Sequence, residues 1–117
     1  MLYANLNRAF ALRGIDKPSE ILLKHGISRP TISRMFSGEK EGVSFRHLEI
    51  ICTILNCTPN DLFEWQPDAK TNLPENHSLY ALKRPEKTRS LKEMIKDVPM
   101  EKLDQVEAFF NELKKEQ

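Results

Sequence analysis

The most constraining feature of this sequence is a pair of helical patterns separated by one glycine and one apolar residue. It lies in the stretch EILLKHGISRPTISRMFSG, residues 20–38. The first helix is expected to begin near Pro18, since proline is tolerated at the first helical position, and to end at Gly26. Ser28 is the predicted N-cap of the second helix. Only Ile27 remains between the two, so the chain must turn sharply from one helix into the other.

Three further helices are predicted on either side of this pair. Gly14 ends a helix in the opening segment, and Ser44 caps another after the polar loop EKEG. Thr58, followed by Pro59 and Asp61, has the pattern of a short fifth helix. The apolar positions expected to face the core are Tyr3, Leu6, Ala9 and Phe10 in the opening helix, Phe45, Leu48, Ile51, Cys52 and Leu55 in the fourth, and Leu62 and Phe63 in the fifth.

The chain divides into three parts by pattern. No segment of the first 65 residues alternates between apolar and polar over a useful length, so residues 1–66 are predicted to be an all-α domain of five helices. Residues 67–89 combine three prolines with polar residues and are expected to be a linker, with a short extended piece at SLYALKR. Helical spacing returns in residues 90–117, which are expected to form a C-terminal pair of helices.

The sequence gives little support to catalysis or metal binding. His25, His47 and His77 have no metal-ligand partner at helical spacing, and no glycine-rich phosphate loop follows a strand. Cys52 and Cys57 are too far apart for a CxxC knuckle and are expected to be reduced thiols. We therefore predict a protein that is not an enzyme and that holds no cofactor and no metal.

Charge and hydropathy limit the classes of partner that the chain can bind. The chain has 18 Lys and Arg against 17 Asp and Glu, so no overall basic field points to a polyanion. No apolar run approaches the roughly 20 residues that span a bilayer, and the N-terminus has no basic-then-apolar signal. The sequence indicates a cytoplasmic protein without a membrane partner, and any DNA binding must rest on local geometry.

Two helices joined by a tight turn around glycine have the form of a helix-turn-helix, whose second helix lies in the major groove of DNA. Here that helix is expected over about residues 28–37. Apolar side chains fix the angle between the helices, while outward arginines pair with guanine and outward serines contact bases or phosphates. The inward set is Ile21, Leu22, Ile27, Ile32 and Met35, and the outward set is Ser28, Arg29, Ser33 and Arg34, with Pro30 and Thr31 adding shape and a hydroxyl.

Residues 2–66 resemble the Cro/C1-type, XRE-family, lambda-repressor-like helix-turn-helix domain. The resemblance lies in EILLKHGISRPTISRMFSG, in SFRHLEIICTILNCTPNDLFEW and in the count of five helices, and it covers a little over half of the chain. It implies a DNA-binding transcription regulator, commonly a dimeric repressor, although activation or repression stays open. The family places a small residue where this chain has Leu22. Base contacts are implied at Ser28, Arg29, Ser33 and Arg34, and phosphate contacts at Thr31, Arg46 and the backbone from Ser37 to Lys40.

These assignments have ordinary structural alternatives. Arg29 and Arg34 could belong to a solvated face, and Ser28 has a sufficient role as an N-cap. The segment KRPEKTR, residues 83–89, either follows a phosphate backbone or minor groove, as an arm does, or is a soluble tether.

The C-terminal helices carry an apolar face too broad for the pair to bury by itself. It must pack on the first domain or on another copy of the chain, and a homodimer sets two recognition helices about 34 Å apart. Two other functions stay open: an antitoxin whose tail binds a toxin, and a protein-interaction module without DNA binding. The face consists of Leu103, Val106, Phe109, Phe110 and Leu113, preceded by Leu91, Met94, Ile95 and Val98.

Overall fold

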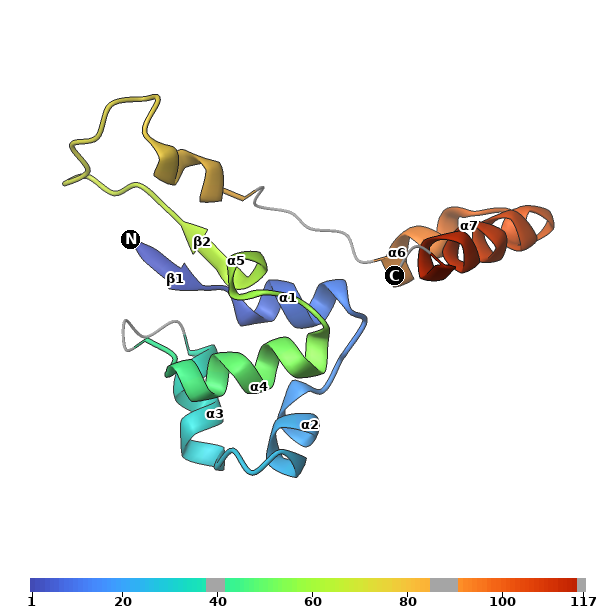
Figure 1. The fold of residues 1–117 in the computed structure, drawn as a ribbon, viewed down its shortest axis with the longest axis horizontal. Coiled ribbons are helices and arrows are strands. Elements are labelled where there is room, and N and C mark those ends of the chain that lie inside the picture. The colour runs from blue at the N-terminus through green and yellow to red at the C-terminus, as the bar shows by residue number, and fades with distance from the viewer. Residues whose placement is uncertain (38–41, 85–90, 116–117) are drawn as a thin grey trace.

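The computed structural model describes residues 1–37, 42–84 and 91–115 (Figure 1). Most of these residues are helical, which confirms the predicted all-α class. The predicted end of the third helix at Gly38 lies outside the described residues. The helices of the first part of the chain are α1 (Leu6–Leu12), α2 (Pro18–Lys24), α3 (Arg29–Phe36), α4 (Phe45–Leu55) and α5 (Pro59–Leu62).

These five helices enclose one apolar core. Phe10 of α1 meets Phe36 of α3, with ring centroids 5.8 Å apart and planes inclined at 49°. Burying a large apolar side chain stabilises the fold by about 1.5–3 kcal/mol, so a small set of such residues supplies most of the driving force. The most deeply buried side chains are Leu6, Phe10, Leu22, Ile51 and Leu62.

The helices end where local chemistry predicts. Gly14, which follows α1, has φ +70°, and the next amide, of Ile15, donates to the Phe10 carbonyl at 3.0 Å. This pairing satisfies a carbonyl that the helix end leaves open. At the start of α5, the Asp61 carboxylate accepts a hydrogen bond from the Thr58 amide at 2.9 Å, which lowers the pKa of Asp61.

A short antiparallel ribbon was not predicted. Strand β1 (Leu2–Ala4) pairs with β2 (Phe63–Trp65), and the two lie side by side in Figure 1. The prediction that Tyr3 belongs to the opening helix was therefore wrong. Asn5 is the N-cap of α1, because its side chain accepts from the Arg8 amide at 3.1 Å, and this fixes the helix start after the strand.

Phe45 was also wrongly assigned to the core. It is the first residue of α4, directly after the N-cap Ser44, and its side chain is 88% exposed. The buried stripe of this helix begins one turn later, at Leu48. Further along the chain, both cysteines are free and half-buried, and burial raises the pKa of the Cys57 thiol to about 11, helped by the neighbouring Cys52.

Residues 67–84 turn back onto β2 and α5. The extended piece predicted at SLYALKR is absent there, because Ser78–Leu82 form a 3-10 helix. Tyr80 of this helix sets the edge of its ring against Trp65, with centroids 4.9 Å apart. Arg84 then donates to the Asn60 carbonyl at 3.0 Å. The division into a domain at 1–66 and a linker at 67–89 stays a prediction, and the linker's last residues, 85–89, lie outside the described part.

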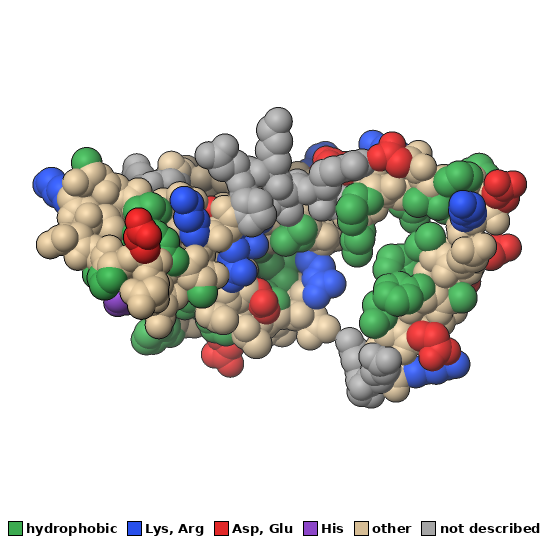
Figure 2. Space-filling model, turned by 90° about the horizontal axis from the view of Figure 1, so that it is seen from above, with side chains coloured by type: hydrophobic (Ala, Val, Ile, Leu, Met, Phe, Trp, Pro, Cys, Tyr) green, Lys and Arg blue, Asp and Glu red, His purple; other side chains and the backbone are tan. Residues whose placement is uncertain are grey.

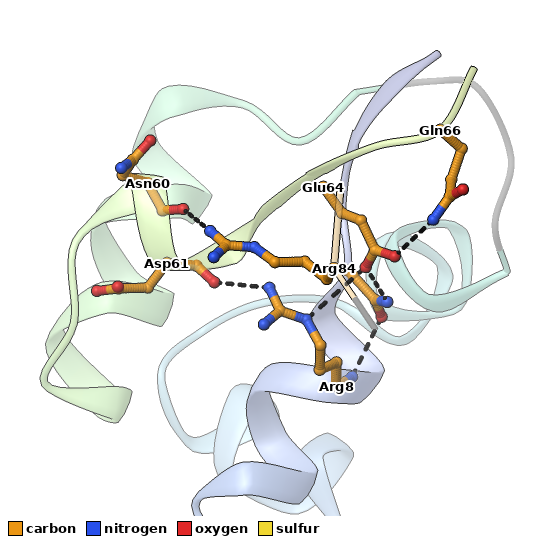
Figure 3. Close-up of polar contacts among 7 residues, drawn as sticks. Arg8, Asn60, Asp61, Glu64, Gln66 and Arg84 are labelled. Carbon is orange, nitrogen blue, oxygen red and sulfur yellow. Dashed lines mark hydrogen bonds and ion pairs between the residues drawn. The ribbon is translucent and has the colours of Figure 1, made fainter. Parts of the chain in front are cut away.

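A buried carboxylate joins the two ends of the first part (Figure 3). Glu64 of β2 accepts hydrogen bonds from the Asn5 side-chain amide at 2.6 Å and from the Gln66 amide at 3.0 Å. The Arg8 Nε lies 3.7 Å from the same carboxylate, and another Arg8 nitrogen donates to the Asp61 carbonyl at 2.8 Å. One cluster therefore ties α1, α5 and the ribbon together.

The environment keeps Glu64 charged. Burial acts to raise the pKa of Glu64, but hydrogen bonds from Asn5, Gln66 and Tyr3 and the charge of Arg8 together hold it below its ordinary value of 4.5. The pKa of the Tyr3 hydroxyl is raised, first by burial and then by the adjacent Glu64 charge.

The C-terminal part, residues 91–115, forms two helical arms: the first is Leu91–Asp97 and the second is Met100–Lys115. Helix α6 (Leu91–Met94) runs into a 3-10 turn at Ile95–Asp97, and a second 3-10 turn at Met100–Lys102 leads into α7 (Leu103–Lys115). Lys92 of α6 forms an ion pair with Asp16, with 2.9 Å between nitrogen and oxygen.

We expect Glu64→Gln to weaken the acid dependence of stability. The pKa of Glu64 is depressed in the folded state, so its stabilising effect is present above the unfolded pKa and is lost as pH falls through the folded pKa. Wild type should lose stability between about pH 5 and pH 3 more steeply than the variant, which at neutral pH should be about 1–3 kcal/mol less stable. Urea unfolding followed by circular dichroism measures both. Glu75→Gln, at an exposed loop position, is the matched control, and parallel profiles for wild type and Glu64→Gln would contradict the role of Glu64.

Candidate nucleic-acid interface

The turn between α2 and α3 is closed by backbone hydrogen bonds. Gly26 has φ +84°, and its amide donates to the Leu23 carbonyl at 3.0 Å. The Ile27 amide donates to the Leu22 carbonyl at 3.1 Å. Both Leu22 and Ile27 are buried, so the turn points its apolar follower into the core and directs the chain outward again at Ser28. Leu22 is accommodated in the core although the resemblance predicts a small residue at that position.

The first turn of α3 is organised by hydroxyl groups. Ser28 is the N-cap, as predicted, and its Oγ accepts from the Thr31 amide at 3.4 Å. The Ser28 hydroxyl donates to the Thr31 hydroxyl oxygen at 2.9 Å, and an Arg34 nitrogen donates to the same oxygen at 3.3 Å. The Arg34 side chain is thereby drawn along the outer surface of the helix rather than left to rotate freely.

Helix α3 separates its residues by face as the sequence predicted. Ile32 is buried, and Met35 and Phe36 are half-buried against the core. Thr31 is half-buried at the boundary between the two faces. The outward residues are Ser28, Arg29, Pro30, Ser33 and Arg34, all exposed, followed by the exposed C-cap Ser37.

Two shallow hollows flank the outward face. One, of about 420 Å³, lies between the start of α2 and α3 and includes Ser19, Arg29 and Ser33 in its lining. The other, of about 240 Å³, lies between α3 and the start of α4 and includes Arg34 and His47. The outward face is therefore a low ridge, with Arg29 beside one hollow and Arg34 beside the other. Such a ridge can enter a groove of DNA, but it cannot enclose a small ligand.

The charge of this ridge has one sign. The α3 sequence, RPTISRMF, contains two arginines and no acidic residue. Within the described residues, the Arg29 side chain makes no hydrogen bond or ion pair, and the Arg34 side chain bonds only to the neutral Thr31 hydroxyl. Both guanidinium groups thus keep donors for an anion or for the acceptor atoms of a base edge.

The remaining predicted contacts are Arg46, Ser37 and Lys40. Arg46 is exposed on the first turn of α4. The Ser37 hydroxyl donates to the Arg34 carbonyl at 3.0 Å, so this residue closes the end of α3. Lys40 lies outside the described residues.

Sequence reasoning did not place three residues that border the hollows. Ser19 lines the hollow beside Arg29, and Ser44 and His47 line the one beside Arg34. The sequence predicted Ser44 as an N-cap, and the side chain of an N-cap accepts a hydrogen bond from the amide three residues later. Here the His47 amide donates to the Ser44 hydroxyl oxygen at 3.2 Å. Their position beside α3 depends on how α4 packs, which the local pattern does not contain.

The predicted dimerisation residues all lie on α7. Leu103 and Val106 are half-buried, whereas Phe109, Phe110 and Leu113 are exposed. They are distant in the chain from the ridge on α3, and their assignment stays a prediction.

Two kinds of site are missing from the part of the chain that the structure describes. It holds no group of three or more His, Cys, Asp or Glu side chains able to bind a metal ion together. In the same ranges, no helix combines the length and the apolar content needed to cross a membrane.

Comparison with known families agrees with this geometry. Residues 5–68, more than half of the chain, match the family model of the Cro/C1-type HTH DNA-binding domain. No match was found among curated proteins or among solved structures. The match spans α1 to β2 and includes the whole ridge.

We expect Gly26→Ala to destabilise the fold although the space around Gly26 is open. A Cβ at this position would meet nothing within 4 Å, so the cost comes from the left-handed backbone alone, about 1–2 kcal/mol. Gly42→Ala is the matched control, since its Cβ also meets nothing and its φ is not positive. Urea unfolding should separate the two variants by about 1 kcal/mol or more. Equal stability would show that the turn relaxes to another conformation.

Proposed function

Because the chain belongs to the Cro/C1-type helix-turn-helix DNA-binding family, we propose that it is a sequence-specific transcription regulator that reads the major groove with α3 and acts as a homodimer. The observation that carries this proposal is the exposed ridge of α3, where two arginines, which have no acidic partner among the described residues, stand above the buried Ile32. A DNA-binding regulator of this kind needs no catalytic step and no cofactor.

The arginines have the role of reading bases. The guanidinium group matches the O6 and N7 acceptors of guanine, and each such bidentate contact discriminates against a wrong base by about 1–3 kcal/mol. Arg34 is partly preorganised by Thr31, so less side-chain freedom is lost when it binds. Arg29 stands at the beginning of α3, where recognition helices place side chains against base edges.

The hydroxyl groups have supporting roles. Ser28 and Ser33 lie on the same exposed ridge as the arginines and can contact bases or phosphates. Thr31, Arg46 and the backbone near Ser37 are assigned to phosphate contacts, and so is Lys40, which lies outside the described residues. Pro30 has no amide hydrogen and contributes shape alone.

Near-neutral charge makes the geometry of the ridge decisive. With 18 Lys and Arg against 17 Asp and Glu, the chain has little long-range attraction for DNA. Binding to unrelated sequences should therefore be weak, and the affinity for a correct site should come from a small number of directed contacts. Two ridges joined in a homodimer double those contacts on a two-fold symmetric site.

The double variant Arg29→Ala with Arg34→Ala tests the reading role. In duplex selection from a random library, wild type should enrich an inverted repeat, and the variant should lose this enrichment. Affinity for the selected site should fall by at least about 2 kcal/mol, near 30-fold, because both bidentate donors are gone. Lys70→Ala, in an exposed loop far along the chain, is the control and should retain the enriched sequence.

Three results are informative. Enrichment that survives the double variant would overturn the role of α3. Enrichment of a single unrepeated half-site would support base reading by α3 and contradict the homodimer. No enrichment by wild type at low salt would overturn the regulator itself.

Arg46→Ala should behave differently from the α3 variants. A phosphate contact carries no sequence information, so its loss should weaken binding to all duplexes by a similar factor and leave the selected sequence unchanged. The slope of log affinity against log salt should become shallower by about 1 for each protomer contact removed. Fluorescence anisotropy at several salt concentrations measures this, and a change in the preferred base with an unchanged slope would assign Arg46 to base reading.

A further inference from the structure

The C-terminal arms, residues 91–115, have no core of their own. None of the helical elements in this range contains a buried residue. Phe109 is 62% exposed, and Leu91, Met94, Ile95 and Leu113 are also exposed. A unit of fewer than about 40 residues usually needs oligomerisation, a metal or disulfides to be stable. Helices of this length are marginal in water when isolated, so the arms require a covering surface.

The first domain covers them only in part. The radius of gyration is 17.0 Å, compared with about 13 Å for a compact chain of this length. One polar link between the two parts is the exposed ion pair of Lys92 with Asp16, and such pairs contribute little, about 0–1 kcal/mol. Figure 1 shows the arms standing apart from the first helices, and Figure 2 shows apolar side chains of the arms on the side of the hollow between the two parts.

That hollow is a groove of about 730 Å³. Its walls are the end of α1 at Leu12, the face of the first arm at Met94 and Ile95, and the face of α7 at Phe109 and Phe110. The apolar faces of both arms line the groove. An occupant that covers these faces must therefore present a row of apolar side chains about as long as α7.

Most side chains that line the groove are apolar, and two of its four polar side chains are engaged elsewhere, the other two being Lys102 and Gln105. Arg13 donates to the carbonyls of Leu55 and Asn56 at 2.7 and 3.2 Å, and Lys92 is paired with Asp16. Sites for small polar ligands have a few free polar groups that converge on the ligand, and engaged cations do not supply them. The groove therefore favours an amphipathic helix.

The charges along α7 indicate which helix fits. Its first turns carry Asp104 and Glu107, and its last turn carries Lys114 and Lys115. Glu112 is bonded to Lys115 at 3.4 Å, which leaves Lys114 as the unshared cation of that end among the described residues. A helix with the same apolar face but the opposite direction would place its basic end beside the acidic end of α7, and the reverse at the other end.

We propose that α7 pairs antiparallel with α7 of a second copy about a two-fold axis, so that the arms of both chains form one apolar core. A second copy satisfies both requirements at once, since it brings the same exposed phenylalanines and the complementary charge order. Two pairs of arms then make a four-helix arrangement in which each groove is covered by the other chain. This deepens the homodimer of the proposed function and rests on it.

A disruption experiment tests whether the groove is the interface. Phe109→Glu places a charge at an exposed position and should leave the monomer folded, while it raises the dimer dissociation constant by about 30-fold or more. Met100→Glu is the matched control, because Met100 is 84% exposed and lies outside the groove lining. Sedimentation equilibrium of full-length protein without DNA measures both. Monomeric wild type at concentrations of tens of micromolar, or a Phe109→Glu protein that dimerises normally, overturns the proposal.

A charge-exchange experiment tests the direction of pairing. Asp104→Lys with Glu107→Lys, and separately Lys114→Glu with Lys115→Glu, should each weaken the dimer by about tenfold, since each places like charges at both ends of the antiparallel pair. The protein with all four changes restores unlike pairs and should dimerise like wild type. Helix stability cannot explain such a rescue, because both double changes oppose the helix dipole and their effects add. High salt should reduce these differences.

A quadruple variant weaker than either double variant overturns the antiparallel pairing, and equal dimerisation of all four proteins does so as well. These outcomes separate from the DNA-reading proposal. If wild type is monomeric and still selects a half-site, only the α7 pairing is wrong. If it is a stable dimer that selects no sequence, only the DNA-reading proposal is wrong.

Discussion

The position of the α3 ridge depends on the left-handed backbone at Gly26. With φ +84° at this residue, the α2 carbonyls are satisfied by the turn itself and Ile27 enters the core within one residue of the helix end. A longer connection would leave the angle between α2 and α3 to side-chain packing alone. Because the turn is fixed by backbone geometry, the outward face of α3 is held as firmly as its buried face. The arginines are exposed, yet the helix that carries them is anchored in the core through Ile32.

A second constraint acts at the other side of the domain. The Glu64 carboxylate is buried and accepts hydrogen bonds from Asn5 and Gln66, with Arg8 nearby, so the start of α1 and the strand β2, which are far apart in the sequence, share one charge (Figure 3). A buried charge is costly when its partners are missing, so this cluster favours one arrangement of the ribbon and α1 over its alternatives. Trp65, held in that ribbon, then offers the surface on which Tyr80 packs. The return of residues 67–84 is thus a consequence of how the domain closes.

These two constraints differ in how far the sequence predicts them. The turn at Gly26, the cap at Ser28 and the outward residues of α3 follow from interactions within a few residues, and the sequence was sufficient to predict them. The ribbon was not predictable in this way, because Leu2 pairs with Trp65 and three-residue strands have no alternation to detect. Phe45 was misassigned because a periodic pattern does not say which residue of a first turn reaches the core. The hollow that contains His47 depends on how α4 packs beside α3, which no local signal encodes.

Because the chain is nearly neutral, DNA binding by α3 depends on the α7 pairing in the proposed dimer. One ridge with two arginines provides few contacts, and a chain of net charge +1 adds little long-range attraction. Joining two ridges makes the second contact intramolecular, which raises the affinity without any new interaction at the ridge. The relation is reciprocal, because DNA with two half-sites must then stabilise the pairing of α7 by the same free energy. In the proposed dimer the second copy would cover the exposed phenylalanines of α7, and the concentration of the protein and the presence of a paired site would together decide how much dimer forms.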